Sequence, residues 1–228
     1  DLNEFFETND QGKLIHETDV NKWLDTLSRN EKYPFSTEEL RDELKHTFWL
    51  LNRVASAKAL QTLLKSHPVF KSYEIVLAAG TGQSDEDDQI VNQNSLARVR
   101  QAIARSDKTI TLSVGQLTTG ITIPEWTAVL MLSNIKSPSL YMQAAFRAQN
   151  PWTFEVGGEV CQKENAYVFD FAPERTLMIY DEFANNLSIH TTAGGGTTED
   201  RKDNVKQLLN FFPVIAEDQD GKMVELDV

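Results

Sequence analysis

Residues 109–132 read TITLSVGQLTTGITIPEWTAVLML and carry the clearest strand pattern of the chain. Two apolar runs, Thr109–Leu112 and Ala128–Leu132, flank a polar segment that contains two glycines and a proline. Short runs that are apolar throughout and are bounded by glycine or proline are typical of strands buried on both faces. The stretch therefore predicts two buried strands joined by a polar loop.

The same pattern recurs on both sides of this stretch. Apolar runs at Phe48–Leu51, Glu74–Ala78 and Ala166–Phe169 predict three more strands. Apolar residues at helical spacing follow the first, second and fourth of the five strands, namely Ala57, Leu60, Leu63 and Leu64, then Leu96, Val99 and Ile103, then Leu140, Tyr141, Ala144 and Ala145. Strands that alternate with helices predict an α/β fold, in which helices joined by right-handed crossovers cover both faces of a parallel sheet.

Three regions are predicted along the chain. Residues 1–47 are expected to be a helical extension or linker from a preceding domain, residues 48–190 the sheet domain, and residues 191–228 a glycine-rich break, a helix and the hairpin that starts a following domain. Ser36 and Glu39 match a capping box in the first region. An apolar stripe there consists of Val20, Trp23, Leu24 and Leu27.

The charge distribution limits the classes of ligand that the chain is expected to bind. The chain has 228 residues, of which 40% are hydrophobic, and a formal net charge of −12. That charge argues against a histone-like nucleic-acid binder. Residues 48–84 and 91–153 nevertheless carry net charges of +3 and +4, so an anionic ligand is expected there. The acidic run at residues 85–88 is expected to be a solvated loop.

Composition also excludes several kinds of site. Cys161 is the only cysteine, which excludes a disulfide framework and a cysteine-rich zinc site and favours a reducing compartment. The four histidines lie outside metal-ligand spacing, so no metal site is expected. No apolar run approaches the ~20 residues of a membrane span, and we expect a cytoplasmic protein. The chain starts at Asp1 without a methionine and is expected to be a piece of a longer protein.

Two segments carry a family resemblance. Residues 113–124 read SVGQLTTGITIP, and residues 141–151 read YMQAAFRAQNP. The pair resembles motifs V and VI of the second RecA-like domain of superfamily 2 helicases. Within that superfamily the pair looks most like the motor subunits of type III restriction enzymes, and next like those of type I. The resemblance covers about residues 48–172.

This resemblance implies a nucleotide site that is shared with a preceding RecA-like domain, which would hold most of the ATP and magnesium. Gln143 and Arg147 would be catalytic and, with Gly120 and Asn150, would bind the nucleotide. Gln143 and Arg147 are four residues apart, so they share a helix face. A guanidinium there can stabilise the charge of a transferring phosphoryl group. Two residues depart from the family pattern: Thr122 replaces an Asp, and Asn150 replaces a second Arg.

Residues 52–60, NRVASAKAL, resemble motif IV, in which a strand runs into a helix. Ser56 is the expected helix cap, and Arg53 adds positive charge next to a helix N-terminus, which is a good phosphate site. A plain cap beside solvated bases is the alternative. The resemblance implies contacts with a DNA backbone at Arg53, Ser56, Thr118, Thr119 and Gly80.

Absent motifs limit what the chain can do alone. It has no P-loop sequence, and Asp181 and Glu182 lie in a helical pattern unsuited to an acidic magnesium box. Residues 76–82, VLAAGTG, also look like the opening of a sugar-nucleotide transferase, but the acidic run that follows would repel a triphosphate. We therefore predict a fragment that is inactive alone.

The most consistent hypothesis is the C-terminal motor domain of a DNA-dependent ATPase, helicase or translocase, as a subunit of a restriction-modification enzyme. Its partners would be DNA, the preceding RecA-like domain and other restriction-modification subunits. A non-catalytic α/β module that binds proteins is the alternative, and the net charge of −9 over residues 154–228 would suit it.

Overall fold

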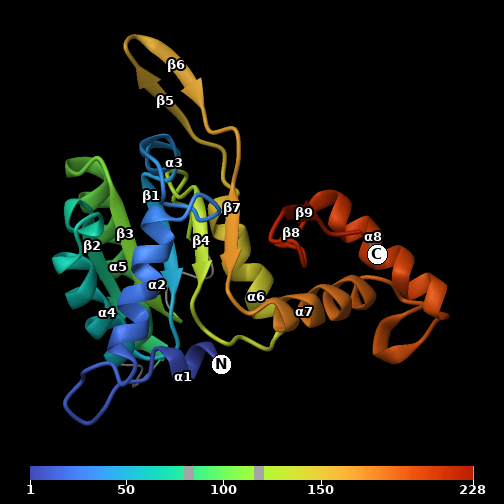
Figure 1. Ribbon diagram of the computed structural model, residues 1–228. Helices are drawn as coiled ribbons and strands as arrows, with labels where there is room; N and C mark the ends of the chain where they lie inside the picture. Colours follow the sequence, from blue (N-terminus) through green and yellow to red (C-terminus); the bar gives the residue numbers. More distant parts are fainter. Residues whose placement is uncertain (80–84, 116–120, 228) are drawn as a thin grey trace. The chain divides into compact units, whose positions relative to one another are not determined.

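The computed structural model describes residues 1–79, 85–115 and 121–227, with only the backbone of residues 85–92. A five-stranded sheet lies at its centre, in the order β2-β3-β1-β4-β7, and all its strand pairs are parallel (Figure 1). Its strands are β1 (His46–Leu50), β2 (Glu74–Ala79), β3 (Thr109–Val114), β4 (Ala128–Met131) and β7 (Tyr167–Asp170). The predicted α/β fold and the predicted strands are therefore confirmed.

β1 is the central strand, because it pairs with both β3 and β4. All five of its residues are buried. Successive side chains of a strand point to opposite faces, so Phe48 and Trp49 lie on opposite sides of the sheet. The Trp49 Nε1–H donates to Thr47 Oγ1 at 2.9 Å, which satisfies the buried indole donor.

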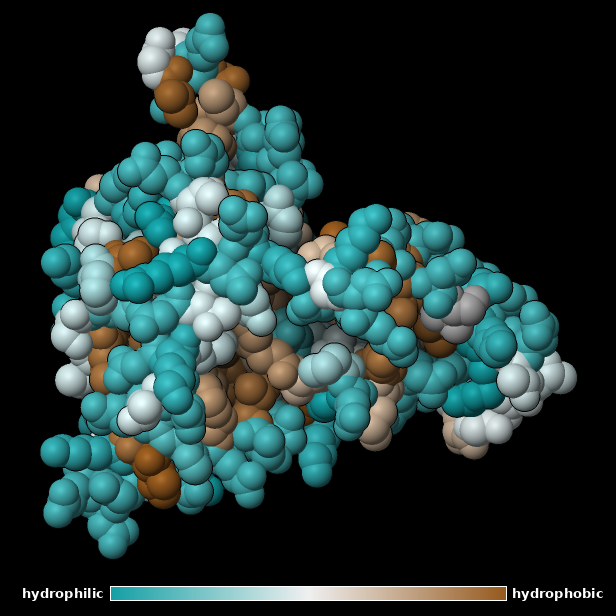
Figure 2. All heavy atoms as spheres, in the orientation of Figure 1, coloured by the Kyte–Doolittle hydropathy of each residue, from teal (hydrophilic) through white to brown (hydrophobic). Residues whose placement is uncertain are grey.

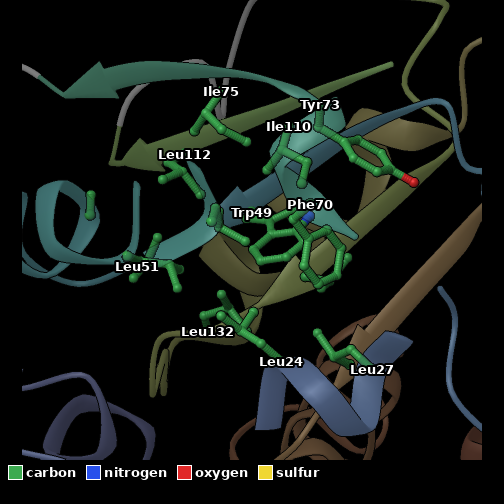
Figure 3. Packing of buried hydrophobic residues seen from close by; sticks show 14 of the residues in the cluster. Leu24, Leu27, Trp49, Leu51, Phe70, Tyr73, Ile75, Ile110, Leu112 and Leu132 are labelled. Atoms are coloured by element: carbon green, nitrogen blue, oxygen red, sulfur yellow. The ribbon is translucent and has the colours of Figure 1, made fainter. Parts of the chain in front are cut away.

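Helices cover both faces of the sheet. They are α1 (Leu2–Phe5), α2 (Glu17–Arg29), α3 (Glu38–Glu43), α4 (Val54–Ser66), α5 (Asp85–Arg105) and α6 (Pro138–Ala145). Leu24 of α2 and Leu60 of α4 belong to one buried cluster with Trp49, and Figure 3 shows Phe70 lying against the same indole. On the other face, the rings of Phe48 and Trp126 lie 4.7 Å apart. Right-handed crossovers place α5 and α6 on that second face.

The N-terminal residues are part of this core. Phe6, Leu14, Leu27 and Phe35 are buried in the same cluster as Trp49. Residues 1–47, expected to be an extension, thus lie in the first of two compact units, which comprises Asp1–Asn134 and Met142–Phe171. The second unit comprises Ile135–Tyr141 and Ala172–Val228. The predicted boundaries at 47 and 190 stay a prediction.

The second unit contains two helices that pack on each other. Its elements are α7 (Pro173–Asn186), the short 3-10 turn η3 (Thr192–Gly194), α8 (Thr198–Phe211), β8 (Ile215–Glu217) and β9 (Met223–Glu225). Thr197 and Asp200 form a capping box at the start of α8. β8 and β9 pair antiparallel, as predicted for the last hairpin.

Two local predictions were wrong. The acidic run at 85–88 is the first turn of α5 and not a loop. Thr37, and not Ser36, caps α3, since its Oγ1 accepts a hydrogen bond from the Leu40 N–H at 3.2 Å. α5 thus begins earlier than the pattern indicated, and α3 begins one residue later.

One hairpin was not predicted. β5 (Thr153–Val156) and β6 (Glu159–Gln162) pair antiparallel around Gly157 and Gly158, which have φ values of +61° and +87°. Two consecutive residues with positive φ match the tight hairpin turns that glycine favours. Apolar spheres are visible on this hairpin at the top of Figure 2, and the valines of its tip, Val156 and Val160, are 58% and 81% exposed.

His46, the first residue of β1, is buried, and it makes the stability of the fold depend on pH. His46 Nδ1 lies 2.9 Å from Thr109 Oγ1, and burial lowers the pKa of His46 from 6.5 to about 4. The imidazole is neutral in the folded chain, whereas the unfolded chain takes up a proton below pH 6.5. The free energy of unfolding should therefore decrease as the pH falls from 6.5 towards 4, by up to about 3 kcal/mol at 1.36 kcal/mol per pKa unit.

Denaturant titrations at pH 7 and pH 4.5 would check this, with His46→Gln as the comparison. Glutamine can still bond to Thr109 but does not titrate, and the carboxylates contribute equally in both proteins. An identical pH dependence in the two proteins would contradict the assignment to His46.

Candidate functional site

The carboxyl ends of the parallel strands meet at one edge of the sheet, here called the carboxyl edge. Leu50 of β1 aligns with Ser113 of β3 and with Met131 of β4. The residues that follow these strand ends are therefore neighbours, and Arg53 and Asn134 are among them. In open α/β sheets, ligands bind outside this edge.

Arg53 lies at the carboxyl edge, at the N-terminus of α4. It is the N-cap of this 13-residue helix and makes no side-chain capping bond. Its side chain is 60% exposed, and Nη1 lies 3.8 Å from Glu7 Oε1. An exposed pair at this distance contributes little to stability, so the guanidinium can exchange its carboxylate for another anion. Arg53 and the free N–H groups of the helix start together make a site for a phosphate.

Ser56 is not where the sequence placed it. It was predicted to cap α4 and to contact DNA, but it is the third residue of the helix and only 3% exposed. The helix starts directly after Arg53, so Ser56 lies on the buried face with Ala57 and Leu60. This is a correction, because a hydroxyl buried against the sheet does not present itself to a DNA backbone.

The N-terminal segment also reaches the carboxyl edge, which the sequence did not predict. The Asn134 N–H donates to Asn3 Oδ1 at 3.0 Å, and Asn134 Nδ2 donates to Asp1 Oδ2 at 2.9 Å. In Figure 1 the arrowheads of β1 and β4 point towards α1. Acidic and amide side chains from residues 1–7 thus contact Asn134 and Arg53 at this edge.

Arg147 lies elsewhere in the first unit, on the 3-10 turn η2 (Phe146–Ala148) that continues α6. Its Nε donates to the Gln143 carbonyl at 3.1 Å, and its Nη1 donates to the Ile121 carbonyl at 2.6 Å. Burial lowers the pKa of Arg147, but a guanidinium stays charged in proteins. These bonds use two of its five N–H groups and join the segment that resembles motif VI to the one that resembles motif V.

The structure does not bring all the predicted residues together. Arg147, with Gln143 one turn earlier, is bound to the segment that crosses to the start of β4, whereas Arg53 follows the end of β1. Asn150 Nδ2 donates to the Arg147 carbonyl at 3.5 Å and closes the turn. Thr122, which replaces the family's Asp, is exposed. Four predicted residues lie outside the described part of the chain, namely Gly80, Thr118, Thr119 and Gly120.

Gly115 is the last described residue before position 121, in the segment that resembles motif V. It follows β3 with a φ of +70°, and an added Cβ would meet no atom within 4 Å. The backbone conformation, and not crowding, therefore requires glycine at this position. This supports a sharp change of chain direction where β3 ends.

Lys163 is a residue that the sequence analysis missed. It follows β6, and its ammonium donates to three main-chain carbonyls, those of Pro124, Trp126 and Ala148. No motif marks it, because main-chain acceptors leave no signature in the sequence. It joins the same two segments that Arg147 joins.

No three His, Cys, Asp or Glu side chains gather as a metal site would require in the part of the chain that the structure describes. None of the helices in the described ranges is long and apolar enough to cross a membrane.

Arg147 also has a structural role that can be measured. Arg147→Ala would leave the Ile121 carbonyl without its donor, which should lower the free energy of unfolding by about 1–2 kcal/mol. The melting temperature should fall by about 2–4 °C for each kcal/mol in a chain of this size. Arg147→Lys keeps a cationic donor and should lose less. Thermal unfolding of the three proteins, followed by circular dichroism, checks this, and equal losses in both variants would contradict it.

Comparisons with known proteins give the following likenesses. No protein-family model matches the chain. It is 29% identical over 180 residues to a protein of Mycoplasma pneumoniae whose name describes it as the C-terminus of the type II restriction enzyme and methyltransferase RM.MpnORF110P. The match covers 75% of this chain and 24% of that protein. The chain therefore spans about a quarter of the relative that it matches.

Solved structures give further likenesses. The chain is similar to the C-terminal part of the Fun30 ATPase domain, with a TM-score of 0.41, 13% identity and coverage of 90% of this chain and 56% of that one. It is similar to domain 2 of the DEAD-box helicase Mss116p bound to an RNA duplex, with a TM-score of 0.44, 15% identity and coverage of 90% of this chain and 64% of that one. It is also similar to the ATP-dependent Type ISP restriction-modification enzyme LlaBIII bound to DNA, with a TM-score of 0.42, 18% identity and coverage of 82% of this chain and 14% of that one. The relative that shares 29% identity is named as a restriction enzyme, which is the class of protein that the motif segments resemble.

Proposed function

We propose that this chain is the C-terminal motor domain of a DNA-dependent ATPase or translocase in a restriction-modification enzyme. The observation that carries the proposal is the bond from Arg147 Nη1 to the Ile121 carbonyl. It holds the two motif segments together in space, although 26 residues separate them in sequence. The likeness to a restriction enzyme supports the proposal independently.

In this proposal, Arg147 supplies charge to a nucleotide held mainly by a preceding domain. Its guanidinium is partly buried and held by main-chain carbonyls, which orient it without neutralising it. It therefore keeps a full positive charge and further N–H groups for a phosphate. ATP with magnesium would supply the phosphoryl group and its counter-charge, and Gln143 and Asn150 would lie beside them.

The DNA contact is proposed at the carboxyl edge, centred on Arg53. The exposed guanidinium and the start of α4 offer sequence-independent phosphate contacts. Thr118, Thr119 and Gly80 remain part of the proposal through the family resemblance alone. Ser56 leaves it, because its side chain is buried. Domain closure on ATP and opening after hydrolysis would then move the protein along DNA.

DNA binding tests the Arg53 contact. Arg53→Ala should weaken binding of the 228-residue chain to all duplexes alike, and the slope of log affinity against log salt should decrease by about 1. Fluorescence anisotropy with two duplexes of unrelated sequence measures both quantities. Lys71→Ala is the matched control, because Lys71 is an exposed base just before the start of β2. A loss confined to one DNA sequence would indicate base readout and would contradict the backbone contact.

Turnover tests the role of Arg147. In the full-length enzyme, Arg147→Ala should lower the DNA-stimulated ATPase rate per folded molecule by about 10²-fold or more and leave ATP binding nearly intact. Arg147→Lys should recover little, because the ammonium lacks the planar fork. Arg100→Ala, an exposed arginine on α5, is the control. Wild-type turnover in Arg147→Ala would remove Arg147 from the catalytic residues.

A further inference from the structure

Lys163 is surrounded by main-chain carbonyls. Its Nζ lies 2.9 Å from the Pro124 oxygen, 2.9 Å from the Trp126 oxygen and 2.8 Å from the Ala148 oxygen. An ammonium has three N–H groups, so these acceptors can occupy all of them. The side chain is about half buried, and burial lowers the pKa of Lys163 to about 8, with a smaller opposing effect of Glu125.

The acceptors belong to the two segments that Arg147 also joins. Pro124 and Trp126 lie in residues 121–127, which lead into β4, and Ala148 is the residue after Arg147. The Ile121 carbonyl, which binds Arg147, lies three residues before Pro124. Two cations thus bridge the same pair of segments at adjacent points. Loss of the carbonyl bonds at one cation should therefore change the position of the other cation.

Lys163 also anchors the β5–β6 hairpin. Its backbone N–H donates to the Trp152 carbonyl at 2.8 Å and closes the hairpin base. The Trp152 ring lies 4.6 Å from the Phe154 ring and 6.2 Å from the ring of His46, at the start of β1. The hairpin base is thus fixed to the sheet and, through the Lys163 side chain, to both motif segments.

We propose that Lys163 is a positioning residue for Arg147. Its three carbonyl bonds hold the end of η2 against residues 121–127 and so fix the direction of the Arg147 guanidinium. It touches neither nucleotide nor DNA in this proposal, and its effect on turnover passes through Arg147. The proposal rests on the proposed role of Arg147 in turnover, but the bridge itself can be tested without that role.

Hydrogen exchange in the 228-residue chain tests the bridge. Three backbone amides report on it: the N–H groups of Trp126, Thr127 and Gln149, which donate to the carbonyls of Ile123, His46 and Phe146. In Lys163→Met all three should exchange about tenfold faster, because the loss of hydrogen bonds to a charged donor frees the segments. Lys163→Arg, which keeps a cationic donor, should recover most of the protection.

Lys65→Met, an exposed lysine in the last turn of α4, should leave the three amides unchanged. Faster exchange only within residues 152–166, with these amides unchanged, would show that Lys163 serves the hairpin alone and would overturn the proposal. Circular dichroism identifies a variant that fails to fold, in which case Lys163→Gln, a smaller change, replaces Lys163→Met.

A double-mutant cycle in the full-length enzyme tests the effect on turnover. Lys163→Met should lower the kcat for DNA-stimulated ATP hydrolysis about tenfold and change the KM for ATP less than twofold, because orientation and not binding is lost. In the Arg147→Ala background the same change should cost almost nothing further. Additive losses would overturn the proposal, since Lys163 would then act by another route.

The two arms separate this proposal from the proposed function. If Arg147→Ala left turnover unchanged, the finger role would fail, and the exchange of Trp126, Thr127 and Gln149 would still decide whether Lys163 holds the end of η2. If the amides were unchanged while Arg147→Ala abolished turnover, the proposed function would stand and the role of Lys163 would fail.

Discussion

The buried strand β1 determines what must pack on each face of the sheet. This strand pairs with parallel neighbours on both sides, and all its residues are inaccessible to solvent. Phe48 and Trp49 therefore need cover on opposite faces of the sheet. Trp126 packs on Phe48, while Phe35 and Phe70 pack on Trp49. β1 is therefore covered on one face by the segment before β4 and on the other by the parts of the chain that contain Phe35 and Phe70.

The parallel order also explains why the candidate site has two separate parts. Strand ends meet at the carboxyl edge, where Arg53 lies beside Glu7. The chain must then cross from the end of β3 to the start of β4, and Ile121 lies on that crossing. Arg147 and Lys163 both bind carbonyls of this crossing segment. Because carbonyls are neutral acceptors, these bonds order the two cations without neutralising their charge.

The sequence predicted the central sheet well, because each of its strands is a short apolar run. It missed β5 and β6, since their side chains are largely exposed and carry little apolar signal, although Gly157-Gly158 is a recognised hairpin turn. It did not show that residues 1–47 pack on the sheet, because the contact between Phe35 and Trp49 of β1 is long-range. Helix periodicity shows that a face is buried but not what covers it.

The candidate site was predictable only where side chains form a pattern. Arg147 and Arg53 were found through motif segments, whereas the placement of Ser56 depended on a helix start that was misjudged by three residues. The partners of Arg147 and Lys163 are main-chain carbonyls, which every residue type has, so no sequence pattern could reveal them.

Bonding to main-chain carbonyls also explains why the two departures from the family pattern leave the bonds of Arg147 in place. Thr122 is exposed and does not alter the Ile121 carbonyl, and Asn150 bonds to the carbonyl of Arg147 and not to its guanidinium. Neither replacement removes the bonds that orient Arg147, because those bonds depend on the course of the backbone and not on the side chains at 122 and 150.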